Sequence, residues 1–325
     1  MPAHNFDILG LGNAIVDVVA AVPEAFLAEH KMVKGTMQLI EADAAEHLYA
    51  AMPPGVESSG GSVANTCAVA AGLGARVGFL GKVADDQLGE VFRHDITAAS
   101  VHFPTPALVG GAPTARSLIL VTPDGQRTMN TFLGACVTFS EADLDPALIA
   151  AADVVYLEGF LFDPPPAQAA FHAAARLARG GGKRVALSLS DPFCVARHRA
   201  AFRALLAHID ILFANEAEIQ SLYETDDFAT AAAAARRDVA LAVLTRSERG
   251  SLILRGAEQV AVPAAPAVVI DTTGAGDAYA AGFLAGLAAG RDLAASGWLG
   301  SRAAALVIGQ YGARPRLGLR DLAAN

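Results

Sequence analysis

Short runs of apolar and β-branched residues alternate along most of this chain with segments that carry a helical pattern. The segments predicted as buried strands are 6–12, 77–80, 154–157, 185–189, 209–213 and 241–245. The helices predicted between them are 63–73, 88–98, 166–178, 200–207 and 228–237. Because strands that are joined through helices pair in parallel and are covered on both faces, the alternation predicts an α/β fold with a mostly parallel central sheet.

Two stretches, approximately 15–40 and 105–135, interrupt this alternation. Thr, Val, Gly and Pro dominate them, a composition that suits short antiparallel strands. Residues 117–122 and 127–133 flank a turn at Pro123-Asp124-Gly125, which predicts a hairpin. We expect both stretches to form a small β-sheet lid over the carboxyl edge of the main sheet, where α/β proteins bind their ligands.

The charge and cysteine content exclude several classes of protein. Lys and Arg number 24 against 33 Asp and Glu, so no general attraction to nucleic acid or to an anionic membrane surface is expected. Cys67, Cys136 and Cys194 are widely spaced and odd in number, which argues against a disulfide framework or a zinc site and favours the cytoplasm. The uncharged helical stretch 278–290 is too short and too Gly-rich to span a bilayer.

The run Asp271-Thr272-Thr273-Gly274-Ala275-Gly276-Asp277 leads directly into a helix-forming stretch. Unpaired N–H groups and the positive end of the helix dipole attract anionic oxygens at such a turn, and small residues let a phosphate approach closely. A carboxylate base beside an anion site suggests phosphoryl transfer. Asp277 could instead serve only as a helix cap, but the two glycines that flank Ala275 favour the anion site.

Two further elements carry polar groups that suit a polyhydroxyl ligand. Gly60 and Gly61 begin a turn that leads into an apolar helix containing Asn65, whose amide both donates and accepts hydrogen bonds. Asn13 and Asp17 follow the first strand and point to one face of an extended segment, where the carboxylate could accept bonds from neighbouring hydroxyls. The alternatives are an ordinary loop-to-helix turn and a solvent-exposed acid.

Two strand ends later in the chain are candidates for nucleotide contacts. Asn215 follows the strand 209–213 and could cap a helix, with Glu218 near the phosphates, where Mg²⁺ prefers carboxylate and water ligands. The same pair is also an ordinary capping arrangement. Thr245 and Gly250 follow another strand and either contact nucleotide phosphates or form a surface turn.

Several common enzyme motifs are incomplete or missing. Gly10-Leu11-Gly12 follows the first strand, but Ile15 occupies the third glycine position of a dinucleotide-binding fingerprint, so an NAD-linked oxidoreductase is not supported. The sequence contains no His-Glu-x-x-His, Gly-x-Ser-x-Gly or Gly-Lys-Thr motif, which argues against zinc hydrolysis, ester hydrolysis and P-loop chemistry.

Taken together, the motifs resemble those of the PfkB-type (ribokinase-like) family of carbohydrate and nucleoside kinases over nearly the whole chain. The run 271–277 is highly specific for that family, and 60–65, 81–89 and 215–218 occur in its order and spacing. The resemblance implies one ribokinase-like kinase domain over 1–325 with the lid described above. The segments that look most like bacterial adenosine-kinase-type members are 12–17, 113–116, 133–136 and 312–315.

The resemblance implies a role for each motif. Asp277 would be the catalytic base, and the N–H groups of Gly274, Ala275 and Gly276 would hold the transferring phosphoryl group. The residues expected to bind the ribose hydroxyls are Asn13, Asp17, Gly61 and Asn65. The residues that could form an apolar base pocket, or simply pack the lid, are Met37, Leu39 and Phe132.

The family also implies Mg-ATP, with Glu218 acting on Mg²⁺ through water. The residues expected near the nucleotide are Asn215, Thr245, Ser247, Gly250 and Thr273. Some members bind a monovalent cation near the residues that match Asp271 and Thr273, so K⁺ is a further candidate. Ala84 and Ser247 stand where the family often has Gly, which leaves details of the nucleotide loop open.

We therefore expect ATP-dependent phosphorylation of the 5′-hydroxyl of a nucleoside, with adenosine converted to AMP. The alternatives are a kinase of a free sugar such as ribose or fructose, and a non-catalytic nucleoside or nucleotide sensor. A sensor would have no need of Asp277. Exposed strand edges of the lid make a homodimer conceivable.

Overall fold

The computed structural model describes residues 5–315 and 318–324, and within them nine strands form the main sheet. The seven from β12 across to β6 are parallel, and β13 and β14 extend one edge in antiparallel fashion. In spatial order the strands are β14 (Glu258–Val262), β13 (Ser251–Arg255), β12 (Leu241–Thr245), β11 (Ile211–Asn215), β10 (Arg184–Ser188), β9 (Ala152–Glu158), β1 (Phe6–Leu11), β5 (Val77–Leu80) and β6 (Val101–His102). The predicted α/β class with a mostly parallel sheet is confirmed.

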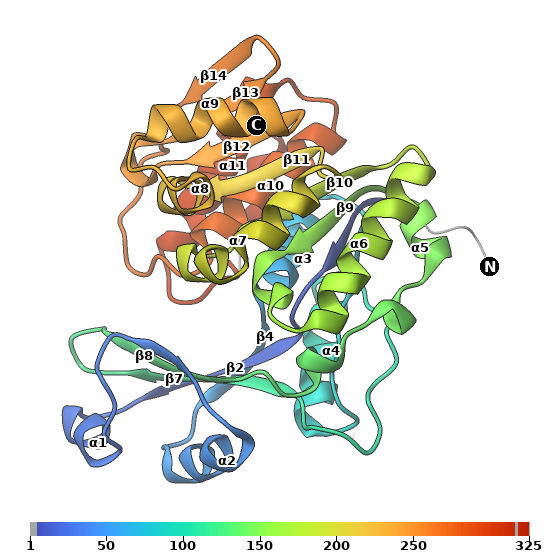
Figure 1. The fold of residues 1–325 in the computed structure, drawn as a ribbon. Coiled ribbons are helices and arrows are strands. Elements are labelled where there is room, and N and C mark those ends of the chain that lie inside the picture. Colours follow the sequence, from blue (N-terminus) through green and yellow to red (C-terminus); the bar gives the residue numbers. More distant parts are fainter. Residues whose placement is uncertain (1–4, 316–317, 325) are drawn as a thin grey trace.

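Helices cover both faces of this sheet, as Figure 1 shows. Alternate residues of one strand serve the two layers: Ile8 of β1 packs into one hydrophobic core and Leu9 into the other. The helices on the Ile8 side include α3 (Ser62–Gly72), α4 (Gln87–Ala98), α10 (Ala275–Ala288), α11 (Leu293–Ile308) and α12 (Leu319–Ala324). The helices on the Leu9 side include α5 (Pro146–Ala150), α6 (Pro165–Gly180), α7 (Pro192–Leu206), α8 (Glu216–Tyr223) and α9 (Phe228–Asp238).

Helix α7 begins well before the predicted start at residue 200. Asp191 accepts hydrogen bonds from the N–H groups of Phe193 and Cys194, and Pro192 occupies the first helical position, so the helix start has both a cap and a favoured N1 residue. Its backbone is non-helical at His198, which marks a kink. The apolar periodicity is regular only after that kink, and this explains the late prediction.

The second sheet has the strand order β3-β8-β7-β2-β4. The predicted hairpin is confirmed, because β7 (Ala115–Val121) and β8 (Arg127–Phe132) pair antiparallel around Gly125, whose φ is +81°. The sheet is mixed rather than wholly antiparallel, since β2 (Ile15–Ala21) pairs with β7 in parallel. It also includes β3 (Met37–Leu39) and β4 (Val56–Gly60), and the latter lies outside the two stretches expected to form it.

The small sheet projects from the main body below the ends of the parallel strands, with α1 (Glu24–Glu29) and α2 (Ala42–Ala51) on its outer side (Figure 1). Its two faces therefore have different environments. Val16 and Val18 of β2 are buried, whereas Ile15 and Asp17 face the side turned toward the main sheet and remain partly accessible. Of the helices in the described residues, none is long and apolar enough to cross a membrane.

Candidate active site

A cleft of about 830 Å³ lies between the small sheet and the main body. Its lining comes from the carboxyl ends of β9, β10, β11 and β12, the start of α10, and one face of the small sheet. Ligands of open α/β sheets bind at this edge, and the volume suits a small molecule with a cosubstrate. Most of the candidate residues meet here, although they lie far apart in sequence.

The turn before α10 has the geometry of an anion site. Gly274 has a φ of +77°, and a side chain there would come within 2.5 Å of Ala313 Cβ, so only glycine fits. Gly276 faces open space, which leaves its backbone accessible. The N–H of Ala275 donates to the carbonyl of Thr272 at 3.2 Å. The N–H groups left in the first helical turn are therefore those of Gly276 and Asp277.

Asp277 is held by the start of α3. Ser62 Oγ donates to Asp277 Oδ1 at 2.6 Å and Asn65 Nδ2 donates to Asp277 Oδ2 at 3.3 Å, while Thr66 bonds its carbonyl. Burial raises the pKa of Asp277 to about 6, against the lowering effect of the Ser62 and Asn65 bonds and of Arg314. The carboxylate is therefore mostly ionised at neutral pH and able to accept a proton.

Glu158, at the end of β9, was not singled out by the sequence reasoning. Its carboxylate accepts hydrogen bonds from Asn13 Nδ2 and from the N–H of Val63, both at 2.8 Å. A side chain at Gly12 would come within 2.2 Å of Glu158 Oε2, which explains that glycine. Burial raises the pKa of Glu158 to about 7. An acidic residue ending a buried parallel strand was the available signal, because such ends meet at the ligand edge.

Asp17 faces the cleft from β2, and no group of the described residues donates a hydrogen bond to its carboxylate. Burial raises its pKa to about 6, while the charges of Arg314 and Arg127 oppose that effect. Gly61 lies beside it at the start of α3 with a φ of +96°, a conformation that favours glycine. An acceptor without a protein donor is suited to ligand hydroxyls.

One face of the small sheet extends the cleft beyond Asp17. The side chains on that face are Met37 and Leu39 of β3, Ser117 and Ile119 of β7, and Met129 and Thr131 of β8. Their pairing follows the strand register, with Ser117 opposite both Asp17 and Thr131. Phe132 is the next residue after Thr131 and lies on the opposite face, buried and outside the cleft lining. The structure therefore does not bring Phe132 to the ligand side, because side chains alternate along a strand.

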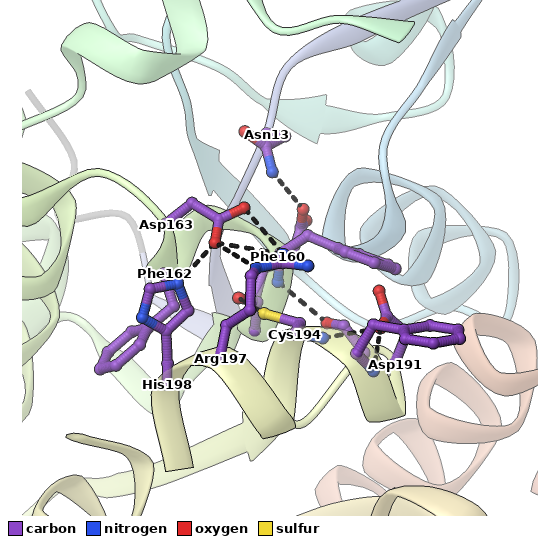
Figure 2. A network of polar contacts seen from close by, with 12 residues as sticks. Asn13, Phe160, Phe162, Asp163, Asp191, Cys194, Arg197 and His198 are labelled. Atoms are coloured by element: carbon purple, nitrogen blue, oxygen red, sulfur yellow. Dashed lines mark hydrogen bonds and ion pairs between the residues drawn. The ribbon is translucent and has the colours of Figure 1, made fainter. Parts of the chain in front are cut away.

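The wall opposite the small sheet comes from the segment after β9 and from the start of α7, and sequence reasoning missed it. Phe160 and Phe193 line the cleft there, and Phe193 is 77% exposed. Figure 2 shows Asp163 bonded to both Arg197 and His198. Arg197 is the single lysine or arginine among the cleft-lining residues that the structure describes. These residues sit in a loop and across a helix kink, where no sequence periodicity reveals them.

The far end of the cleft contains Asn215 and Thr245, which pair in register at the ends of β11 and β12. Asn215 caps α8, and its backbone N–H and side-chain amide both donate to the Glu218 carboxylate. Burial raises the pKa of Glu218 to about 7. Ser247 and Gly250 belong to the turn that follows and are outside the cleft lining.

The residues near Asn215 offer few protein ligands for Mg²⁺. Within the described part of the chain, no three His, Cys, Asp or Glu side chains cluster as a metal cage. Glu218 is one of several carboxylates that line the cleft, and both of its oxygens accept bonds from Asn215, so contact with Mg²⁺ through a water molecule is the mode left to it. Mg²⁺ commonly keeps several waters and completes its shell with substrate phosphate. The residues present fit that mode of binding.

The expected potassium position is already occupied by a side-chain cation. Arg127 of β8 forms an ion pair with Asp271 at 2.5 Å and donates to Thr273 Oγ1 at 3.1 Å. The other Asp271 oxygen accepts bonds from Thr273, and Gly312 N–H donates to Asp271 Oδ2. Both carboxylate oxygens are therefore satisfied by protein groups, so the geometry does not favour a potassium ion at Asp271.

Comparison with known proteins agrees with this geometry. The chain is similar to the adenosine kinase from Sinorhizobium meliloti, with 51% identity, a TM-score of 0.91 and coverage of 98% of this chain and 99% of that one. It is also similar to a probable sugar kinase protein from Rhizobium etli, with 46% identity, a TM-score of 0.92 and coverage of 99% and 98%. It is 31% identical to the ATP-dependent ribose-1-phosphate kinase of Halopiger xanaduensis, over 79% of this chain and 83% of that protein.

A model of the pfkB family of carbohydrate kinases matches residues 36–317, a range that includes the small sheet's β3 and the whole turn before α10. The same range contains Asp277 and the α3 residues that hold it. The chain is an ATP-dependent kinase that belongs to the pfkB carbohydrate kinase family.

Proposed function

We propose that this protein transfers the γ-phosphoryl group of Mg-ATP to the 5′-hydroxyl of a nucleoside, converting adenosine to AMP. The observation that carries the choice of acceptor is the extent of the cleft. It continues past Asp17 onto the face formed by Met37, Leu39 and Met129, with Phe160 on the opposite wall. A free sugar would leave this apolar part unfilled, whereas a purine has large apolar faces that bury well between such side chains.

In this proposal Asp277 takes the proton of the 5′-hydroxyl as the phosphoryl group transfers. Its carboxylate is kept in place by Ser62 and Asn65. The first-turn N–H groups of α10 would bind the transferring group. A loose phosphoryl-transfer transition state requires little from the base until late, so positioning and charge stabilisation supply most of the rate. The helix start provides both without any movement of the backbone.

Asp17 and the neighbouring polar groups would bind the ribose. The Asp17 carboxylate has no donor among residues 5–315 and 318–324 and can accept bonds from two adjacent hydroxyls, while Asn13 and Asn65 add amide groups at the cleft wall. Asn13 is oriented by Glu158. A buried acceptor that is left unpaired by an analogue lacking those hydroxyls would discriminate strongly against it.

The nucleotide would lie along the ends of β11 and β12. Asn215, Thr245 and Thr273 line that part of the cleft, and Glu218 would hold Mg²⁺ through water. When bound, Mg²⁺ neutralises charge on the phosphate oxygens. Ser247 and Gly250 remain proposals for contacts with the phosphates or the base. Potassium is not part of the proposal, because Asp271 and Thr273 are engaged with Arg127.

The small sheet would act as a lid, closing over the acceptor to exclude water and limit ATP hydrolysis. Its outer strands β3 and β4 have unpaired edges in the chain described here, so we also propose that a homodimer could form through them. A cytoplasmic location remains a proposal based on the three buried free cysteines.

The test is ADP release from Mg-ATP with adenosine, inosine, guanosine, ribose and fructose as acceptors, with Asp277→Asn as the control. We expect turnover with adenosine to exceed turnover with either sugar, and the variant to lose it. Turnover with a sugar alone would keep the reaction and favour the second candidate, a sugar kinase, which the similarity to the Rhizobium etli and Halopiger proteins also supports. Ligand binding without turnover of any acceptor would instead favour a sensor.

A further inference from the structure

Arg314 reaches into the site from the segment that follows α11. Its Nε donates to Asn65 Oδ1 at 2.8 Å, and its Nη1 donates to Ser59 Oγ. The third nitrogen, Nη2, is buried without a hydrogen-bond partner among the described residues. Arg314 belongs to the segment 312–315 noted in the sequence, but no role was assigned to it there, and it is not among the residues that line the cleft.

The bond to Asn65 decides which way its amide points. A side-chain amide has one accepting oxygen and one donating nitrogen, and a flip exchanges the two. With Oδ1 bonded to Arg314, Nδ2 is turned toward Asp277 Oδ2 at 3.3 Å. The flipped amide would oppose NH₂ to the guanidinium and oxygen to the carboxylate, and both contacts would be repulsive. Arg314 therefore selects the rotamer that donates to Asp277.

The guanidinium is also the counter-charge of an acidic cluster. Asp17 of β2, Asp95 of α4 and Asp277 of α10 all face it, together with the Cys67 thiol of α3. Burial lowers the pKa of Arg314 to about 10, so it stays charged at every pH at which the carboxylates titrate. The Asp277 charge in turn raises the pKa of Asp17, of Glu158 in β9 and of Glu218 in α8.

The residues just before Arg314 contact the catalytic turn itself. Gly312 N–H donates to Asp271 Oδ2 at 2.8 Å, and Ala313 packs against Gly274 so closely that no side chain could be added there. One short segment thus contacts the first residue and the middle of the turn 271–277 and, through Arg314, the amide that faces the carboxylate.

We propose that Arg314 is a positioning residue for phosphoryl transfer, which orients Asn65 toward Asp277 and supplies the positive charge that keeps the Asp17 and Asp277 carboxylates ionised. The assay rests on the proposed function, because it needs an acceptor that is turned over. The geometric argument does not depend on which acceptor this is.

The test compares Arg314→Met and Arg314→Lys with the wild-type protein in kcat and kcat/KM from pH 5 to pH 9. In Arg314→Met we expect kcat to fall about tenfold or more and the acidic limb of kcat/KM to move up by about one pH unit, because both carboxylates lose their counter-charge. Arg314→Lys keeps the positive charge but loses the planar guanidinium that bonds Asn65. The acidic limb of its kcat/KM profile should therefore stay near the wild-type position while kcat falls.

A matched control is Arg93→Met. Arg93 is also a partly buried arginine, bonded to the carbonyls of Phe103 and Thr105, and neither of these partners lines the cleft. Its loss should lower the melting temperature and leave the pH profile in place. If Arg314→Met behaved in the same way, with an unshifted acidic limb, Arg314 would be structural only and the proposal would be overturned.

A second readout needs no turnover. NMR titration of ¹³C-labelled aspartate side chains in the free protein should show the Asp277 carboxyl titrating at higher pH in Arg314→Met, and unchanged titration would overturn the charge role.

If Arg314→Met does not fold, Arg314→Lys combined with Asn65→Ala tests the amide role. The loss of kcat in the double variant should be much smaller than the sum of the losses in Arg314→Lys and Asn65→Ala, because both substitutions act through one amide. A loss equal to that sum would contradict the amide role. If wild-type protein turns over no acceptor, the proposed function fails, while the titration still decides the role of Arg314.

Discussion

The start of α10 and the inner face of the small sheet border the same cleft, yet they are built in opposite ways. Around Asp277, polar groups from α3 and from the segment before α12 are bonded to one another, and the backbone is fixed by Gly274 against Ala313. On the small sheet, Met37 is 50% exposed and Leu39 is 57% exposed. If the proposed function is correct, the reacting groups lie in a preorganised frame, whereas the acceptor is bound by apolar side chains that the ligand must cover.

The charged contact that joins the two regions is the Arg127–Asp271 ion pair, between a strand of the small sheet and the turn before α10. Both side chains are largely buried, at 12% and 7% exposure. Two hydrogen bonds, from Arg127 to Thr273 and from Arg314 to Ser59 of β4, add further links between the small sheet and the turn region. Substitutions on the two sides should separate kcat from KM accordingly.

Asp277→Asn should produce the largest change, on the rigid side of the comparison. Loss of the base is expected to lower kcat by at least about a hundredfold, or about 3 kcal/mol, with little change in the acceptor KM. Steady-state kinetics with adenosine measure this directly. Near-normal turnover would remove Asp277 from the role of base.

The same substitution should act on stability in a pH-dependent way. Burial raises the pKa of Asp277 to about 6, so the stability that its protonated form contributes is present at low pH and is lost as the pH rises through about 6. Replacing it by the neutral amide should raise the melting temperature at pH 8 more than at pH 4.5. An equal shift at both values would contradict the raised pKa.

Acidification should reduce activity through both sides of the cleft. Burial raises the pKa of Asp17 and of Asp277 to about 6 in the free protein, and the proposed function needs each of them as a carboxylate. Between pH 7 and pH 5, kcat/KM is expected to fall by about a hundredfold, with a slope approaching two at the acid end. A limb centred near pH 4 would show that neither carboxylate has the predicted environment.

Asp17→Ala should affect the ligand side of the site. Removal of the acceptor for two ribose hydroxyls is expected to raise the KM for the nucleoside by about thirtyfold, with a smaller effect on kcat. Matched assays with 2′-deoxy- and 3′-deoxyadenosine locate the lost bonds, since the variant should discriminate less against them than the wild type does. An unchanged KM would place the ribose elsewhere.

Arg127→Met breaks the charged connection between the two regions. We expect kcat/KM to fall about tenfold, because the turn before α10 loses its charged link to the acceptor side, and Asp271 is left without its counter-charge. As a second experiment, kcat/KM of the variant is measured again with potassium or sodium added at up to 100 mM. Recovery with potassium but not with sodium would show that the vacated Asp271 and Thr273 can hold the cation that Arg127 replaces.

Leu39→Ala should have the smallest effect. Its side chain is more than half exposed and contributes little to folding, so the melting temperature should hardly change. The KM for adenosine is expected to rise a few-fold and that for ribose to stay the same, because only the base reaches that face. A matching rise for ribose would contradict the base pocket.

The parallel core could be predicted from the sequence because the evidence for each of its strands and helices is local. Apolar runs such as those of β1, β5 and β12 are short, continuous and bounded by helical patterns, and that is sufficient to predict a covered parallel sheet. The same reasoning missed β4, whose five residues carry no alternation, and placed the start of α7 too late because the kink at His198 interrupts its periodicity.

The success of the site predictions also depended on whether the evidence for a residue was local in the sequence. Asp277, Asp17 and Asn65 could be proposed because each lies next to a strand end or helix start, features that are visible in sequence. Phe132 was chosen for its type, and the one-residue alternation of β8 places it away from the ligand. Glu158 was missed although it ends a buried parallel strand, and Phe160 lies in the cleft without any distinctive neighbours in sequence.

The sequence by itself determined the sheet, its helices and the anion-binding turn, since periodicity and the unpaired N–H groups of a helix start depend only on neighbouring residues. Only the tertiary structure decided which charges meet. The Arg314–Asn65 bond joins positions 249 residues apart, and the Asn65–Asp277 bond joins positions 212 apart. Such contacts depend on how α3, α10 and the segment after α11 pack together, and the free energy of that packing is shared over the whole core rather than encoded beside either partner.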